Sequence, residues 1–420
     1  MIALVNPVSS GAQLTEALLE EGAEFLHVYT EDRAPAAPSG GLPVKTVVHT
    51  GLDATAGRLR AMGVTTVLAG SEFGVTLADE LAEALGVPHH RHELRAARRD
   101  KYWMARALAD AGVPHAGTEA VRSEDELRTV LDRWGTFPVV VKPFNSAGSD
   151  GCHICADAGQ AIDAFRANSG RRNLMGEVND GVLVQQFLEG PQYIVNTVSM
   201  TGRHLLAEIY AERIDREQGA PVLRHIVSRR TLDEAETELV AYVMRCLDAL
   251  GVREGAAHTE VILTAGGPRL VEVNSRLMGP YLSADAYHVA YGYSSPHLLA
   301  ESLLRPEEFT NRFDLPYGPG RSLAKVYLRA HRAGTVRALD GLRRVRRLPG
   351  FHSVARIPAV GEPVRDGQLT TGGCGVAFFV HEDAELLQHS LDVLHEIEDA
   401  GELYRIEDES DTSPAAESGD

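Results

Sequence analysis

The chain has 420 residues, 44% hydrophobic and 24% charged, a composition typical of a globular protein large enough for several domains. Its formal net charge of −18 argues against a general electrostatic attraction to nucleic acid, although backbone N–H groups, lysines and metal ions still bind phosphates locally. Four cysteines form no disulfide framework, no apolar stretch reaches membrane-spanning length, and the N-terminus does not resemble a signal peptide. We therefore expect a cytoplasmic protein with no membrane segment.

Strand and helix signals alternate over the first hundred residues. Strands are predicted at Ile2–Val5, Phe25–Tyr29, Val44–His49 and Thr66–Ala69, and helices at Gln13–Glu21 and Val75–Leu85. Such alternation is typical of an α/β fold with an open parallel sheet. A further amphipathic helix is predicted at Lys101–Ala111, where Gly112 ends it.

A buried strand delivers a lysine to a loop of small residues. The apolar run before Lys142 predicts the strand, and residues 146–151 follow as a Ser/Gly loop. Ser146, Gly148, Ser149 and Gly151 let the backbone approach an anion closely, and Lys142 adds a positive charge beside it. The spacing fits neither a Walker A loop nor the dinucleotide fingerprint. The pattern therefore predicts a phosphate site, with a flexible surface turn as the alternative.

Two acidic residues face each other in a predicted hairpin. Strands are expected at His258–Leu263 and Arg269–Val273, joined by the turn Gly266-Gly267-Pro268, so that Glu260 and Glu272 lie side by side. Alternation along the second strand puts Glu272, Asn274 and Arg276 on one face. Because the hairpin is rich in apolar residues, its carboxylates need partners, and oxygen donors of this kind suit Mg²⁺. A solvated hairpin face is the alternative.

The segment Leu183–Gln192 is an apolar strand that runs into a Gly-Pro turn. Backbone groups there could meet an adenine edge, while Phe187 and Leu188 cover its faces. An ordinary strand end would have the same pattern. Further strands are predicted at Tyr193–Met200, His204–Glu212, Ser322–Leu328 and Gly375–Val380, with helices at Asp233–Leu250 and Ala384–Glu398.

In order and spacing, these segments resemble the ATP-grasp superfamily in its biotin-carboxylase-like branch, which includes L-amino-acid ligases. The loop KPFNSAGSDG and the strand end E-x-N-x-R, in that order in one chain, carry the resemblance. It implies an ATP-grasp fold, α/β with an α+β grasp region. The implied divisions are an N-terminal parallel-sheet domain (1–98), a lid region (99–188), a central grasp subdomain (189–318) and a C-terminal subdomain (319–406). Residues 407–420 are acidic and lack aromatic side chains, which predicts a disordered tail.

The resemblance also implies roles for individual residues. ATP and Mg²⁺ are the implied cofactors, with two ions expected and Mn²⁺ as a substitute. ATP is expected to contact Lys101, Lys142, Ser146, Gly148, Ser149, Gly151, Gln185, Gln186, Phe187, Leu188 and Gln192. The metal ligands implied are Glu260, Glu272 and Asn274. Substrate contacts are expected from Arg276, Met278, Gly279 and Lys325, and catalytic contacts from Arg276, Lys142, Arg224 and His225.

The implied activity is a ligase reaction that joins a small carboxylate to an amine through an acyl-phosphate, releasing ADP and phosphate. A homodimer is the family expectation. The chain departs from the family at Gln192, where relatives usually carry glutamate, and a neutral amide there can still bond ribose hydroxyls. A carboxylase of the biotin-carboxylase type and a non-catalytic nucleotide-binding protein remain as alternatives. For Lys325, a solvated lysine at a sheet edge is the alternative to a substrate contact.

Overall fold

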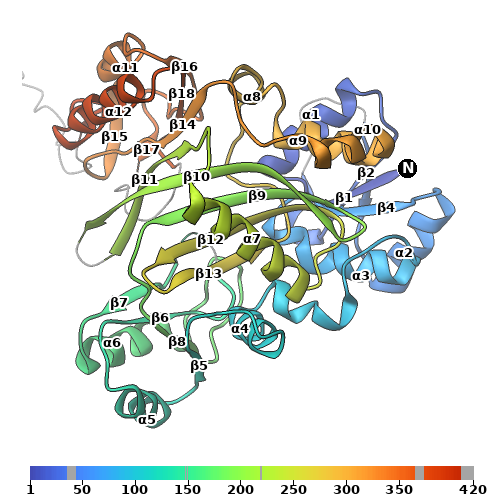
Figure 1. Ribbon diagram of the computed structural model, residues 1–420, viewed down its shortest axis with the longest axis horizontal. Helices are drawn as coiled ribbons and strands as arrows, with labels where there is room; N and C mark the ends of the chain where they lie inside the picture. The colour runs from blue at the N-terminus through green and yellow to red at the C-terminus, as the bar shows by residue number, and fades with distance from the viewer. Residues whose placement is uncertain (36–43, 147, 149, 218–219, 365–372, 408–420) are drawn as a thin grey trace, which may run out of the picture.

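Strands of one large sheet form the centre of the molecule (Figure 1). The computed structural model describes residues 1–35, 44–146, 148, 150–217, 220–364 and 373–407. Within these residues the strands form four sheets. None of the helices described is both long and apolar enough to cross a bilayer.

The N-terminal sheet is parallel, as the sequence predicts. Its strands are β1 (Ile2–Val5), β2 (Phe25–Tyr29), β3 (Lys45–Val48) and β4 (Thr66–Ala69), in the order β3-β2-β1-β4. The helices of this region are α1 (Ser10–Glu20), α2 (Leu52–Ala61) and α3 (Val75–Leu85). Strands β1 and β2 are buried along their whole length, because helices cover parallel sheets on both faces.

A smaller antiparallel sheet, which we call the lid sheet, follows in the chain. Its strands are β5 (Thr118–Val121), β6 (Val139–Lys142), β7 (His153–Cys155) and β8 (Val182–Gln186), in the order β5-β8-β6-β7. The accompanying helices are α4 (Lys101–Asp110), α5 (Glu124–Trp134) and α6 (Ala158–Asn168). Asp100, Ser123 and Asp157 cap the three helices by accepting backbone N–H bonds. Figure 1 shows the lid sheet beside β12 and β13 of the large sheet.

The large sheet combines the grasp strands with strands from near the C-terminus. Its members are β9 (Gln192–Met200), β10 (Arg203–Glu217), β11 (Ala220–Ser228), β12 (Gly255–Thr264), β13 (Gly267–Asn274), β14 (Ser322–Tyr327), β16 (Phe351–Ala355) and β18 (Val376–His381). Their order is β13-β12-β9-β10-β11-β14-β18-β16. A third small sheet contains β15 (Gly334–Ala338), β17 (Pro363–Val364) and β19 (Arg405–Glu407). Glu407, where the sequence predicts the start of a disordered tail, belongs to β19, and the rest of that predicted tail lies outside the described residues.

Helices cover the large sheet on both faces. They are α7 (Glu234–Ala249), α8 (Ala284–Tyr291), α9 (Ser295–Leu304), α10 (Pro306–Asn311), α11 (Asp340–Val345) and α12 (Ala384–Asp399). Short 3-10 helices are η1 (Glu31–Arg33), η3 (Glu72–Gly74), η4 (His92–Leu94), η5 (Ala96–Arg98) and η6 (Arg312–Asp314). Helix α7 packs on one face through Leu239 and Val243, which contact Val261 and Val273 in one core cluster. Helix α8 packs with Ile194 and Tyr210 on the opposite face, which is the face that carries Glu260.

Candidate active site

A cavity of about 660 Å³ is lined by both the lid sheet and the large sheet. Its wall includes most of the residues that the sequence predicts for nucleotide, metal and substrate. These are Lys101, Lys142, Ser146, Gly148, Gln185, Gln186, Phe187, Leu188, Gln192, Glu260, Glu272, Arg276, Met278 and Gly279. Residues more than 170 positions apart in the chain therefore meet in one enclosure of the size that small-molecule sites have.

The predicted pairing of the two acids is confirmed. Glu260 of β12 lies directly opposite Glu272 of β13 in the antiparallel register. Asn274 donates a hydrogen bond from Nδ2 to Glu272 Oε1 over 2.9 Å, and Lys101 Nζ lies 2.8 Å from Glu272 Oε2. Burial by itself would raise the pKa of Glu272, but the charge of Lys101 and the Asn274 bond hold it well below its usual range. The hairpin thus presents the ionised Glu272 carboxylate at the cavity, with Glu260 opposite it.

The loop that contains Ser146, which we call the phosphate loop after its predicted role, is held close to Lys101. Lys101 donates from Nζ to the Ser146 carbonyl over 2.9 Å, and Ser146 Oγ donates to Asp150 Oδ2 over 2.8 Å. Gly151 has φ +70°, and a Cβ there would collide with the Asn168 side chain, so glycine is required at this position. Ser149 lies outside the described residues. The backbone of this loop is therefore open to the approach of a phosphate, and Lys101 contacts the loop at Ser146.

Lys142 is buried at the end of β6, and its side chain is held by Gln185, the first residue of the segment 185–188 that we call the hinge. It donates from Nζ to Gln185 Oε1 over 3.0 Å, and Gln185 donates in turn from Nε2 to Thr118 Oγ1 over 3.0 Å. Desolvation lowers the pKa of the Lys142 ammonium. An anion beside Lys142 would restore its usual basicity, so the position favours a bound phosphate.

The hinge residues use their side chains to position each other. Gln186 accepts a hydrogen bond at Oε1 from the Gly117 N–H over 3.1 Å, whereas Phe187 and Leu188 line the cavity. Cys152, which the sequence places in a Cys-x-x-Cys run, also lines the cavity beside Lys142. Burial raises the pKa of its thiol.

Gln192, the residue that departs from the family pattern, bridges two carboxylates. It donates from Nε2 to Glu260 Oε2 over 3.2 Å and also hydrogen-bonds Glu212. Burial and the neighbouring Glu260 raise the pKa of Glu212 well above its usual range. A glutamate at position 192 would place a third carboxylate between these two acids, so the amide is the residue that the local charge favours.

Glu212 and Glu72 are acids at or beside the site that the sequence did not predict. Glu212 of β10 lines the cavity, and Glu72 in η3 connects the N-terminal sheet to the substrate end. Glu72 Oε2 lies 2.9 Å from Arg276 Nε, and Glu72 Oε1 lies 2.6 Å from Arg99 Nη1. Glu72 therefore fixes the orientation of Arg276 from the region of the N-terminal sheet. The available signal for Glu72 was its place directly after the predicted strand Thr66–Ala69.

Lys325 is not placed in the cavity wall, contrary to its predicted role in substrate binding. The alternative of a solvated edge lysine is also wrong, since Lys325 has 0% exposure in the interior strand β14. Its Nζ donates to the Gly279 carbonyl over 2.8 Å. Desolvation lowers the pKa of Lys325 to about 7. Lys325 thus supports the cavity segment at Gly279 from behind.

Arg224 and His225 do not face the cavity, which corrects their predicted catalytic role. Arg213 pairs with His225 but Ile214 pairs with Leu223, so a bulge at this point adds one residue to β11. The bulge leaves Leu223 at the cavity and turns His225 toward α12, where its ring stacks on His395.

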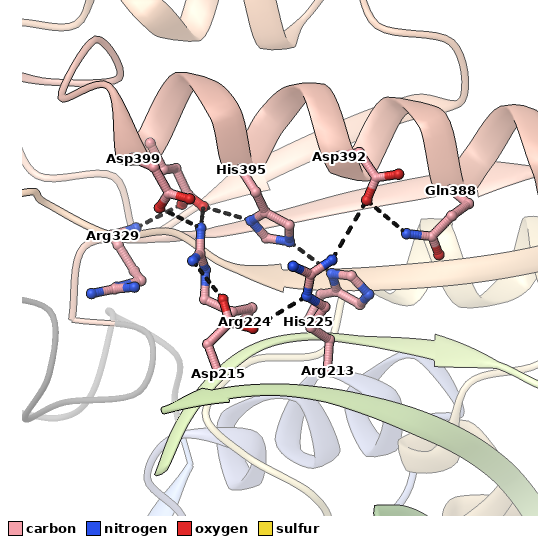
Figure 2. Close-up of polar contacts among 10 residues, drawn as sticks. Arg213, Asp215, Arg224, His225, Arg329, Gln388, Asp392, His395 and Asp399 are labelled. Carbon is pink, nitrogen blue, oxygen red and sulfur yellow. Dashed lines mark hydrogen bonds and ion pairs between the residues drawn. The ribbon is translucent and has the colours of Figure 1, made fainter. Parts of the chain in front are cut away.

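Figure 2 shows the resulting polar cluster between the β10–β11 hairpin and α12. Arg224 lies 2.8 Å from Asp215 and 2.9 Å from Asp399, and His395 Nδ1 lies 2.8 Å from Glu398 Oε2. These charges are mutually paired. Arg224 and His225 therefore anchor α12 to the back of the sheet.

The fold and the site define a class of protein. The ATP-grasp domain model matches residues 135–285. Dapdiamide A synthase from Enterobacter agglomerans is 30% identical over 413 residues, covering 95% of this chain and 96% of the relative. The chain belongs to the ATP-grasp family, and within it to the ligases that join a carboxylate to an amine.

Two further comparisons agree with this assignment. Alanine–anticapsin ligase from Bacillus subtilis (strain 168) is 24% identical over 274 residues, covering 61% of this chain and 56% of the relative. The crystal structure of an L-amino acid ligase from Bacillus licheniformis has the same fold, with a TM-score of 0.77 at 19% identity. The match covers 97% of this chain and 98% of that one.

Proposed function

We propose that the enzyme uses ATP to activate the carboxylate of one amino acid and joins it to the amine of a second, forming a dipeptide-like product. The observation that carries the proposal is the single cavity in which Glu260 and Glu272 meet two lysines and Arg276. The names of the relatives, which include an alanine–anticapsin ligase and an L-amino acid ligase, support amino acids as the substrate class.

The acid hairpin fits Mg²⁺, with Mn²⁺ as a substitute. All prospective donors are oxygens, and Asn274 uses Nδ2 toward Glu272, which leaves its Oδ1 available. Within the described residues, no three His, Cys, Asp or Glu side chains are close enough to hold an ion by themselves. Oxygens from Asn274 and the nucleotide would complete the coordination, and we propose two ions. The bound ions would offset the negative charge of the triphosphate.

The residues of the chain then act mainly by position and charge. Lys101 and Lys142 hold phosphate oxygens, and Arg276, oriented by Glu72, holds the substrate carboxylate. A carboxylate oxygen attacks the γ-phosphorus, the bond to the ADP oxygen breaks, and an acyl-phosphate forms. The amine nitrogen attacks the acyl carbon, inorganic phosphate leaves, and the nitrogen releases a proton. The loop at Ser146 and Gly148 must cover the intermediate, because water would hydrolyse it.

Product analysis tests this proposal. The protein is incubated with ATP, Mg²⁺ and pooled amino acids, and phosphate release and the mass spectrum are recorded. We expect ADP, phosphate and a mass equal to two amino acids minus one water. Phosphate release that requires bicarbonate would indicate a carboxylase instead, and the absence of any ATP turnover would indicate a nucleotide-binding protein.

We also propose that the enzyme is a cytoplasmic homodimer that does not bind nucleic acid. The family resemblance supports the dimer, and the net charge of −18 supports the lack of nucleic-acid binding. Light scattering coupled to size-exclusion chromatography measures the first property. A monomer at micromolar concentration would contradict it.

A further inference from the structure

Glu212 has one carboxylate oxygen without a partner in the cavity wall. Its Oε2 atom is buried, and it makes no hydrogen bond within the part of the chain that the structure describes. A buried acceptor that receives no hydrogen bond costs the free energy of removing that group from water. The cavity that Glu212 lines is therefore missing a donor at this point, and a ligand is the natural source of one.

The strand register places Glu212 between two ends of the cavity. Glu260 lies opposite Ile194, which lies opposite Tyr210, and this row holds the acid hairpin. Two residues further along the strands, Ile262 lies opposite Gln192, and Gln192 hydrogen-bonds Glu212. Two residues advance a strand by about 7 Å. The row of Gln192 and Glu212 is thus displaced by this distance from the row of Glu260.

The direction of this displacement is toward the hinge. Residues 185–188 lead through Gly190 and Pro191 into the first residue of β9, which is Gln192, and the Pro191 carbonyl accepts from the Leu263 N–H over 2.9 Å. If adenine occupies the hinge and the triphosphate occupies the acid hairpin, the sugar lies between them. The row of Gln192 and Glu212 lies in that stretch.

Glu212 does not belong with the metal ligands. After burial, Glu260 contributes most to its raised pKa, and Gln192 hydrogen-bonds both carboxyl groups. Within the described residues, Glu212, Glu260 and Glu272 do not form a group able to hold one ion. A ribose, by contrast, presents two adjacent hydroxyl donors to a carboxylate acceptor.

We propose that Glu212 accepts hydrogen bonds from the ribose hydroxyls of the nucleotide and makes the enzyme select ribonucleotides over deoxyribonucleotides. The inference rests on the proposed function, because it requires ATP in this cavity. Gln192, which bonds Glu212, has the role of orienting this carboxylate. The acid that binds the ribose is thus on β10, the strand next to β9, which begins at Gln192.

Equilibrium binding tests the inference without using turnover. Mg–ADP, Mg–2′-deoxy-ADP and Mg–3′-deoxy-ADP are titrated calorimetrically into wild type, Glu212→Met and the exchange variant Gln192→Glu/Glu212→Gln. We expect wild type to bind ADP several-fold to about tenfold more tightly than at least one deoxy analogue, as one hydrogen bond to a buried carboxyl implies. Glu212→Met should lose this preference while its affinity for that analogue stays within twofold. The exchange variant should keep part of the preference.

Glu254→Met is the matched control. Glu254 is a half-buried carboxyl group outside the cavity, and burial raises its pKa as it does for Glu212. It should retain the wild-type preference. An unchanged preference for ADP over the deoxy analogues in Glu212→Met would overturn the role of Glu212 and leave the ligase proposal intact. Failure of wild type to bind Mg–ADP at all would contradict both.

Discussion

Replacing Glu272 with glutamine tests whether the acid hairpin is a metal site built on a buried charge pair. The substitution keeps the size of the side chain and one oxygen for the Asn274 bond. It removes the charge that Lys101 contacts at 2.8 Å, where the two side chains are only 13% and 18% exposed. Lys101 then remains in the cavity wall without its carboxylate.

The expected loss of stability follows from this geometry. Breaking a buried ion pair by removing one partner costs about 3–5 kcal/mol, and the residual exposure of both groups favours the lower end. A loss of about 3 kcal/mol lowers the Tm by roughly 6–12 °C for a domain of 150–250 residues. Catalysis should fall more steeply, by about 100- to 1000-fold, because the lost charge stabilisation amounts to several kcal/mol.

The assay measures melting and ATP turnover with magnesium varied from micromolar to millimolar concentration. Wild type should gain stability when Mg–ADP is added, and Glu272→Gln should gain much less. Glu236→Gln is the control, since Glu236 lies 2.6 Å from Arg229 outside the cavity. It should lower the Tm without changing turnover per folded molecule. Wild-type turnover and magnesium dependence in Glu272→Gln would refute the metal site.

Four further predictions concern single residues. Lys142→Met should raise the KM for ATP about tenfold or more without lowering the Tm, because folding desolvates this lysine; an unchanged KM would contradict its phosphate contact. Glu72→Gln should lower kcat/KM for the carboxylate substrate about tenfold with the KM for ATP unchanged, since it orients Arg276; equal changes in both would refute this. Arg224→Met should lower the Tm by several degrees yet keep turnover within threefold, because its partners lie behind the sheet; the reverse result would restore a catalytic role. Lys325 has a folded pKa of about 7, below the 10.5 of the unfolded chain, so unfolding takes up a proton between these values. The stability of wild type relative to Lys325→Met should therefore rise from pH 7 to pH 10, by up to about 1.4 kcal/mol per pH unit, and parallel melting curves would contradict this.

Local patterns were sufficient to predict that a hairpin brings the two acids together and that a Ser/Gly loop follows Lys142. The exact pair was not fixed by the turn: Val261 pairs with Leu270, and a register shift that leaves Val271 as an extra residue in β13 brings Glu272 opposite Glu260. Lys142 ends a strand that the apolar run before it predicts clearly, and Ser146 follows four residues later in the chain. Most of the predicted ATP contacts lie in such segments, and the cavity brings them together.

Contacts between distant segments could not be predicted in the same way. The bulge in β11 changes the face of His225, and one extra residue in a strand leaves no clear pattern in the sequence. Glu72 and Arg276 are 204 positions apart, and only the packing of the N-terminal sheet on the grasp strands joins them. Lys325 lies in a strand that the sequence predicts, but its interior position depends on β11 and β18 on either side.

Transfer of oxygen from the carboxylate substrate to phosphate tests the proposed chemistry most directly. The amino acid pool is labelled with ¹⁸O in its carboxylates, and the phosphate released during ligation is analysed by mass spectrometry. We predict one ¹⁸O atom in each phosphate, because the attacking carboxylate oxygen leaves with phosphorus. Unlabelled phosphate, or release of AMP and pyrophosphate instead of ADP, would contradict an acyl-phosphate formed in this cavity.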